Sequence, residues 1–166
     1  MASMEWRGID SKTRARLADH LQAPPVSLSA MAQSLGVKVL SSALPPGISG
    51  EIRPDPSTPA GFIIRVNKND SSRRQRFTVA HELAHFLLHR DMIGNGVTDD
   101  VLYRSSLSDA REAQANRLAA DLLMPRALID AWLERAKTLS VEDPIEFLAD
   151  KFGVSTAAMK IRLGVH

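Results

Sequence analysis

Three histidines and a glutamate interrupt an otherwise apolar segment, RFTVAHELAHFLLH, at residues 76–89. His81 and His85 are four residues apart, so on a helix they would project from the same face about one turn apart. Two imidazoles placed in this way can reach one zinc ion, and Glu82 on the flank of that face can hold a water molecule beside it. The H-E-x-x-H pattern therefore predicts His81 and His85 as metal ligands and Glu82 as the general base.

The surrounding residues predict that this helix is largely buried, and it should run from Asp70 or Ser71 to about Arg90. Burying histidines and a carboxylate without partners costs several kcal/mol, which a shared metal ion would offset. His89 continues the spacing of four, but at ~1.5 Å per residue it lies about 12 Å from His81 along the helix. We therefore expect His89 to close the end of the helix, pack against the next loop or contact substrate.

Three protein ligands usually hold a hydrolytic zinc ion and leave a fourth position for water, so a second helix should supply another ligand. The segment REAQANRLAADLLMP carries Glu112 and Asn116 four residues apart on one face, with small alanines that permit close helix packing. Asp109 and Asp121 are alternative ligands, and Glu112 could instead pair with neighbouring arginines. The residues alone leave this choice open.

Two further features are candidates for contact with substrate. Tyr103 is the only tyrosine and could stabilise an oxyanion, or it could have a surface or core role. The run RRQR at 73–76 places arginines at a helix start, where the helix dipole favours acidic groups. It could bind an acidic partner or DNA, or it could be solvated, with Arg76 paired to an internal carboxylate. The substrate itself should lie extended along an edge of the sheet.

The expected elements define an α+β fold, with a small sheet or hairpin packed on the H-E-x-x-H helix and a helical segment at the C-terminus. Besides that helix we expect helices at 11–21 and 27–36, a strand at 37–40, a hairpin of ISGEIRP and GFIIRVN around the loop DPSTPA, a loop at 91–107, helices starting at Ser108 or Asp109 and at Pro125, and two short helices joined at Gly153-Val154. Two units are expected, a metallopeptidase domain at 1–135 and a helix-turn-helix-like extension at 136–166. Residues 1–10 are expected to be a tag remnant or a disordered end.

Composition narrows the classes of protein. The chain has 166 residues and no cysteine, which excludes disulfides and thiolate metal ligands. No apolar run approaches the roughly 18 residues that a membrane span needs, so we expect a cytoplasmic protein without membrane contact. The net charge of +2 is mild for a protein that lives on nucleic acid.

The C-terminal segment LADKFGVSTAAMKIRL has the shape of a helix-turn-helix. As a DNA reader it would offer only Lys151, Lys160 and Arg162 as strong phosphate contacts. We therefore interpret it as a structural module suited to docking a partner, and direct DNA binding is the less favoured alternative.

The chain resembles the ImmA/IrrE family of small bacterial and phage metallopeptidases over residues 25–163. Two motifs carry the resemblance, RFTVAHELAHFLLH and the later EAQANRLAADLLMP. The resemblance implies a zincin-like fold, with Zn²⁺ or Mn²⁺ on His81, His85 and Glu112, and Glu82 as general base. It also implies that Asn116 supports the ligand helix. Gln114 departs from the many members that carry a glutamate there, which removes a rival ligand.

Family members act with helix-turn-helix repressors. The resemblance therefore implies a zinc-dependent endopeptidase that cleaves or inactivates an XRE-type repressor and releases phage, mobile-element or stress genes. Two other functions remain open: an anti-repressor that binds without cutting, its metal serving structure, and a DNA-binding regulator. Metal content separates the DNA-binding regulator from the others, and a Glu82→Gln variant separates cleavage from binding alone.

Overall fold

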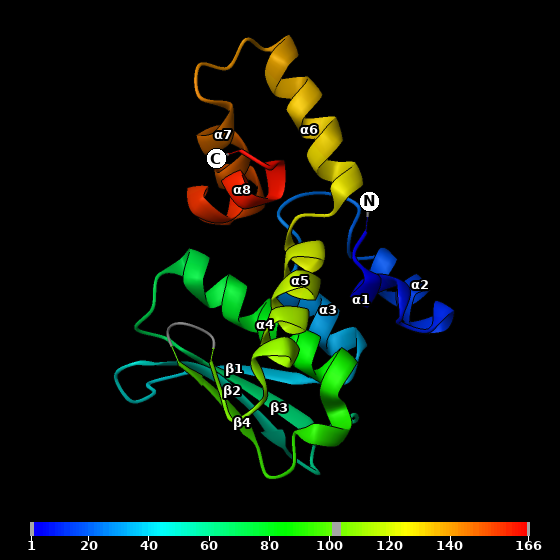
Figure 1. Cartoon of the computed structure of the whole chain (residues 1–166). Helices are drawn as coiled ribbons and strands as arrows, with labels where there is room; N and C mark the ends of the chain where they lie inside the picture. The colour runs from blue at the N-terminus through cyan, green and yellow to red at the C-terminus, as the bar shows by residue number, and fades with distance from the viewer. Residues whose placement is uncertain (1, 101–103, 166) are drawn as a thin grey trace.

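A computed structural model describes residues 2–100 and 104–165 (Figure 1). The elements in chain order are α1 (Met4–Arg7), α2 (Ser11–Ala18), α3 (Leu28–Ser34), β1 (Lys38–Ser42), β2 (Ile48–Pro54), β3 (Phe62–Asn67), α4 (Ser72–His89), the short 3₁₀ helix η1 (Arg90–Met92), β4 (Val97–Asp100), α5 (Asp109–Leu123), α6 (Arg126–Thr138), α7 (Pro144–Phe152) and α8 (Thr156–Leu163). The predicted α+β class is confirmed.

The four strands form one mixed sheet in the order β1-β3-β2-β4. The predicted hairpin is confirmed, because β2 and β3 pair antiparallel with Ile52 opposite Ile64, while β1 runs parallel to β3. The prediction of a loop throughout 91–107 is wrong, because Val97–Asp100 forms β4 and pairs antiparallel with β2. β4 therefore lies at one end of the sheet order.

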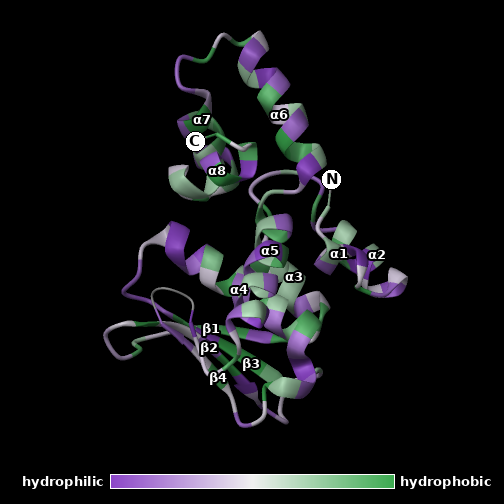
Figure 2. Ribbon diagram, viewed as in Figure 1, coloured by the Kyte–Doolittle hydropathy of each residue, from purple (hydrophilic) through white to green (hydrophobic). Residues whose placement is uncertain are grey.

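Helix α4 crosses one face of the sheet and packs on β2 and β3 (Figure 1). Its start is set by Ser71, whose Oγ accepts a hydrogen bond from the backbone N–H of Arg74. Figure 2 shows a hydrophilic first part of α4, and the buried residues begin at Thr78. This boundary leaves the arginine run near the surface and carries the histidines into the interior.

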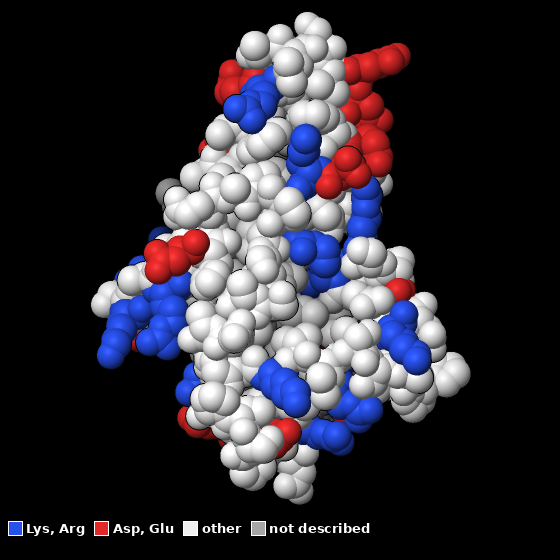
Figure 3. Space-filling view, turned by 180° about the vertical axis from the view of Figure 1, so that it is seen from behind, with Lys and Arg blue, Asp and Glu red and all other residues white. Residues whose placement is uncertain are grey.

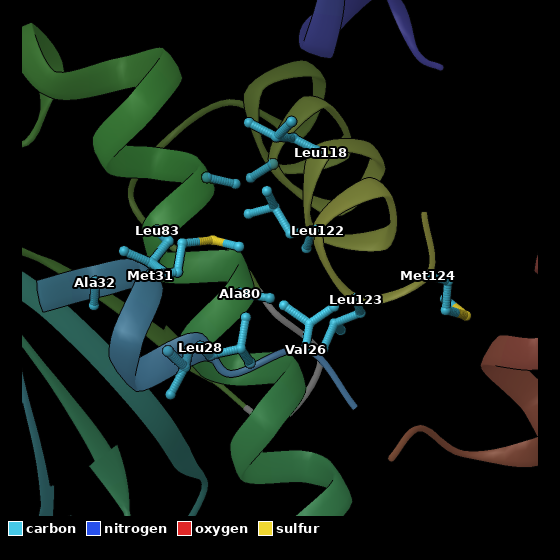
Figure 4. Packing of buried hydrophobic residues seen from close by; sticks show 14 of the residues in the cluster. Val26, Leu28, Met31, Ala32, Ala80, Leu83, Leu118, Leu122, Leu123 and Met124 are labelled. Atoms are coloured by element: carbon cyan, nitrogen blue, oxygen red, sulfur yellow. The ribbon is translucent and has the colours of Figure 1, made fainter. Parts of the chain in front are cut away.

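The main core lies where α3, α4 and α5 meet (Figure 4). Side chains from the three helices converge there, among them Leu28, Met31, Ala80, Leu83, Leu118 and Leu122. Fully buried alanines on α4 and α5 keep the contact between these helices short. Close packing of α4 on α5 brings the polar faces of the two helices together at one point.

The last three helices form a unit joined to α4 and α5 (Figure 1). α7 ends at Gly153, whose left-handed backbone (φ 66°) allows the turn into α8, as predicted. Arg76 on α4 donates hydrogen bonds to the backbone oxygens of Phe152 and Gly153. The predicted boundary at 135/136 falls inside α6, which is one continuous helix across it.

The described N-terminal residues contact α5, where a tag remnant or a disordered end was expected. Ser3 donates a hydrogen bond from its backbone N to Asp121 Oδ2 at 3.1 Å. Glu5 pairs with Arg117 at 2.6 Å. These contacts join residues more than a hundred positions apart, and they cover one side of α5.

Two features of the described residues bear on contact with a membrane or with DNA. None of the helices in residues 2–100 and 104–165 is both long and apolar enough to cross a membrane. On the face shown in Figure 3, Lys and Arg side chains are scattered among uncharged surface and interrupted by acidic groups. That face has no continuous basic area of the kind that duplex binding requires.

Candidate metal centre

The H-E-x-x-H residues lie on the buried face of α4 that meets α5 and the sheet. His81, Glu82 and His85 are each 0% exposed. The Nε2 atoms of His81 and His85 face each other at 3.0 Å. The structure therefore brings together the two imidazoles that the helical spacing pairs.

Glu112 reaches the same point from α5. Its Oε1 lies 2.8 Å from His85 Nε2 and its Oε2 lies 3.2 Å from His81 Nε2, while Ser105 donates a hydrogen bond to Oε1. The two alternative ligands are elsewhere. Asp109 is exposed at the start of α5, and Asp121 pairs with Arg162 at 2.8 Å.

A further carboxylate, Asp99 on β4, also lies at this point and was not among the candidates from sequence. Its Oδ1 lies 3.3 Å from His81 Nε2 and its Oδ2 lies 3.9 Å from His85 Nε2. One ligand atom from each of His81, His85, Asp99 and Glu112 lies within 4.8 Å of the others, and all four residues are buried. The available signal was the period-two pattern of β4, in which Val97 and Asp99 both face inward.

The donor set fits a divalent transition metal. Ligands about 2.0–2.1 Å from a tetrahedral ion lie about 3.3 Å from one another. The separations of 2.8, 3.0, 3.2 and 3.3 Å among the nitrogens and oxygens of this cluster are close to that spacing, and the 3.9 Å between Asp99 Oδ2 and His85 Nε2 is longer. Two imidazole nitrogens with carboxylate oxygens suit zinc, and manganese is also compatible with them.

Outer hydrogen bonds orient both imidazoles toward the cluster. His81 Nδ1 lies 2.8 Å from Asn116 Oδ1, so a proton on Nδ1 leaves the lone pair on Nε2. His89 Nε2 lies 2.8 Å from Gln114 Oε1, and His89 Nδ1 lies 3.0 Å from His85 Nδ1. If His89 donates to Gln114, its Nδ1 accepts from His85, whose Nε2 then also carries a lone pair toward the cluster.

Burial and mutual charge perturb the titration of this group in the metal-free protein. Burial opposes a charged His81, but the carboxylates of Asp99 and Glu112 outweigh it and raise the pKa of His81 to about 9. Burial and then the charge of Asp99 raise the pKa of Glu82 well above its ordinary value. For Glu112, burial is the largest influence and acts upward, but hydrogen bonding to His81 and His85 overrides it and lowers the pKa.

The remaining candidates have different surroundings. His89 is 4% exposed and supports His85, so in this state it is not placed at a surface where substrate could contact it. The guanidinium of Arg76 donates hydrogen bonds to backbone oxygens, including that of Val26 at 3.0 Å, and among the described residues it pairs with no carboxylate. Burial lowers its pKa. Tyr103 lies outside the described residues.

An α+β fold with a buried histidine–carboxylate cluster on a helix is typical of metal-dependent hydrolases. The family model described as Peptidase_M78, the IrrE N-terminal-like domain, matches residues 32–164. The chain belongs to this metallopeptidase family, and the predicted ImmA/IrrE membership is confirmed.

Two known proteins are similar to this chain, one in sequence and one in fold. A stretch of 77 residues, 46% of this chain, is 39% identical to the radiation response metalloprotease IrrE of Deinococcus deserti, of which it covers 27%. The fold is similar to that of a Mycobacterium tuberculosis transcriptional regulator, with a TM-score of 0.55 and 19% sequence identity. That likeness covers 96% of this chain and 48% of the regulator. The chain thus spans less than half of the length of either relative.

Proposed function

We propose that this chain is a metal-dependent endopeptidase in which His81, His85 and Glu112 hold Zn²⁺, with Mn²⁺ as the alternative ion, and Glu82 is the general base. The observation that carries the proposal is the convergence of two histidine nitrogens and Glu112 oxygens within 2.8–3.2 Å in a buried site. Glu82 lies beside them, with Oε1 4.0 Å from His81 Nε2. Membership of a metallopeptidase family supports the same chemistry.

When bound, the metal supplies the Lewis acidity that activates water and polarises the scissile carbonyl. Glu82 takes the proton from that water and passes it to the leaving amine. Its raised pKa suits the first of these steps, because a carboxylate with an ordinary pKa is a weaker base for taking a proton from water. Asn116 and His89 hold the two imidazoles in the orientation that the ligands need.

The substrate is a helix-turn-helix repressor that presents an extended segment. β4 lies at the end of the sheet next to the cluster, so a peptide paired along it would bring a main-chain carbonyl near Glu82. The name of the Deinococcus relative, a radiation response metalloprotease, fits a role in stress regulation. Inactivation of the repressor would then release stress, phage or mobile-element genes.

A protein partner is favoured over DNA by the position of α8. Its residues Ala158 and Ile161 line hollows together with Phe77 of α4 and Asn116 of α5. Ile161 is 82% exposed, so this face of α8 offers an apolar side chain at the surface beside the catalytic helices. An exposed apolar side chain fits a protein partner better than the phosphates of a duplex.

Intact-mass analysis of a repressor encoded beside this gene tests the proposal. After incubation with the zinc-loaded protein, two new fragments should sum to the repressor plus one water. The Glu82→Gln variant should retain zinc and lose cleavage by about 10²–10⁴-fold, the usual contribution of a general base. Full turnover by the variant would refute the role of Glu82. An intact repressor that still forms a complex with both proteins would favour the anti-repressor alternative.

A further inference from the structure

We propose that Asp99 is a fourth protein ligand of the metal and that it closes the resting site. The inference rests on the proposed metal site of His81, His85 and Glu112 and adds to it. Asp99 comes from a strand, β4, where the other three come from helices. Because a strand can shift separately from the two helices, we expect the role of Asp99 to differ from that of the other three ligands.

Asp99 carries a charge that is buried and not satisfied by hydrogen bonds from residues 2–100 and 104–165. The carboxylate of Asp99 is 0% exposed, and among the described residues His81 and His85 lie 3.3 and 3.9 Å from its oxygens without hydrogen-bond geometry. A buried carboxylate without donors is costly unless a cation lies beside it. Within the described residues, both oxygens of Glu82 and Oε2 of Glu112 also lack hydrogen bonds. One divalent cation and one proton would neutralise these three carboxylates.

The distances from Asp99 to the histidines also place it among the ligands. Asp99 Oδ1 lies 3.3 Å from His81 Nε2, almost the same as the 3.2 Å between that nitrogen and Glu112 Oε2. Asp99 therefore occupies the same shell around the centre as Glu112. A carboxylate that only oriented Glu82 or a ligand from outside would contact the far side of those groups.

The pairing of β2 with β4 positions Asp99 at the metal cluster. Asp99 pairs with Gly50 on β2, next to a register irregularity between Ile48 and Gly50. A Cβ at Gly50 would collide with Thr78 of α4 and would come within 3.8 Å of Glu82 Cγ. Glycine thus lets β2 approach α4 closely, and the irregularity adjusts the strand pairing beside Asp99.

Four protein ligands have a consequence for access to the metal. Structural zinc sites are closed by four protein ligands, whereas catalytic sites keep one position open for water. With Asp99 bound the site is closed, so activity requires Asp99 to withdraw. β4 has only four residues and lies at the end of the sheet order, so it is the element that a peptide paired along the edge would shift. Peptidase activity would then depend on the docked partner.

Cobalt(II) binding to the purified chain tests this inference. Wild type, Asp99→Asn and Asp100→Asn are compared, because Asp100 is the adjacent carboxylate on β4 and its Oδ2 pairs with Arg104 at 3.4 Å. Chelator competition gives the Kd for Co²⁺. Azide is then added to each saturated protein, because this small anion changes the visible spectrum of cobalt only where it gains a coordination position.

Asp99→Asn should weaken Co²⁺ binding by about 100-fold or more, because loss of a direct ligand should cost at least as much as the 10–100-fold that loss of an outer partner costs. Its spectrum should change with azide, while those of wild type and Asp100→Asn should not. An unchanged Kd, an azide response in wild type, or no response in Asp99→Asn would each overturn the inference. The wild-type measurement decides alone if the variant fails to fold.

If the proposed metal site of His81, His85 and Glu112 is itself wrong, the Co²⁺ measurements give a different result. If wild type binds no Co²⁺, or binds it as tightly after His85→Ala, the metal site itself is absent. If wild type binds Co²⁺ through His85 and responds to azide, the three-ligand site stands and only the role of Asp99 falls.

Discussion

His89 Nδ1 lies 3.0 Å from His85 Nδ1, and this contact connects the last turn of α4 to Gln114 of α5. His89 is too far along the helix from His81 to share one ion with it, but it determines which nitrogen of His85 carries the proton. The histidine that extends the H-E-x-x-H spacing thus acts behind the cluster. Its position beside His85 explains why three histidines occur on one buried helix.

Removing this support should weaken metal binding without unfolding the chain. We expect His89→Phe and Gln114→Leu each to raise the Kd for Zn²⁺ by about 10–100-fold, because the outer partner of His85 is lost. Gln114→Glu should bind zinc at least as well as wild type, because a carboxylate also accepts from His89. Chelator competition measures the Kd, and His20→Phe is the control. Equal zinc affinities across the series would contradict the role of His89 and Gln114 in orienting His85.

Asn116 should have a similar effect on the other imidazole. Its Oδ1 is 2.8 Å from His81 Nδ1, so Asn116→Ala removes the acceptor that orients His81. We expect a loss of zinc affinity of about 10–100-fold. Asn69→Ala, an exposed asparagine after β3, should bind zinc as wild type does. If Asn116→Ala retained full affinity but lost cleavage, Asn116 would instead contact substrate.

The sequence predicted the parts of this site that depend on local periodicity. His81 and His85 could be paired because helical spacing is set within one turn, and Glu112 could be added because a second motif resembled a known family. Asp99 could not be predicted, because a carboxylate at an inward strand position makes VTDD look like a polar loop. Its burial depends on the approach of β2 to α4 at Gly50, a contact between distant segments.

Contacts between distant residues also determine the structure at the N-terminus, which local patterns in the sequence could not predict. The composition near residues 135 and 136 neither indicates nor excludes a domain boundary, and the structure shows that α6 continues through these residues. The ordering of Ser3 depends on Asp121, which is 118 residues away. By contrast, the start of α4 and the turn at Gly153 could be predicted, because a serine cap and a left-handed glycine act on their immediate neighbours.

The metal-free protein should lose stability as the pH rises from about 6.5 to 9. The pKa of His81 is about 9 in the folded chain against an ordinary 6.5, so its stabilising proton is fully present below pH 6.5 and lost through pH 9. This difference corresponds to on the order of 3 kcal/mol. The raised pKa of Glu82 acts in the same direction, because a folded state that favours the neutral acid is penalised as the pH rises.

Thermal unfolding in the presence of a chelator, followed across this pH range, measures the effect. The His81→Gln variant should have a flatter profile, because the shifted imidazole is absent. Excess Zn²⁺ should also reverse the trend, because the metal binds deprotonated imidazole and its affinity rises with pH. A metal-free stability that stayed level between pH 6.5 and 9 would contradict the protonated state of His81.

The ion pair between Arg162 and Asp121 should hold the C-terminal unit to α5. The side chains are 11% and 6% exposed, their atoms are 2.8 Å apart, and Arg162 also donates to the backbone oxygen of Met124. Arg162→Met leaves Asp121 buried with Ser3 as its one remaining partner among the described residues, which should cost about 3–5 kcal/mol. At about 2–4 °C per kcal/mol, Tm should fall by roughly 10 °C.

Calorimetry of Arg162→Met beside Lys160→Met tests this, since Lys160 is exposed on the same helix and should change Tm little. The double variant Arg162→Met, Asp121→Asn should recover part of the loss, because it removes the uncompensated carboxylate. The affinity for Zn²⁺ should stay within a few-fold of wild type, since neither side chain belongs to the metal cluster. A Tm equal to that of Lys160→Met would mean that the C-terminal unit is held mainly by its contacts with Arg76 and the apolar core.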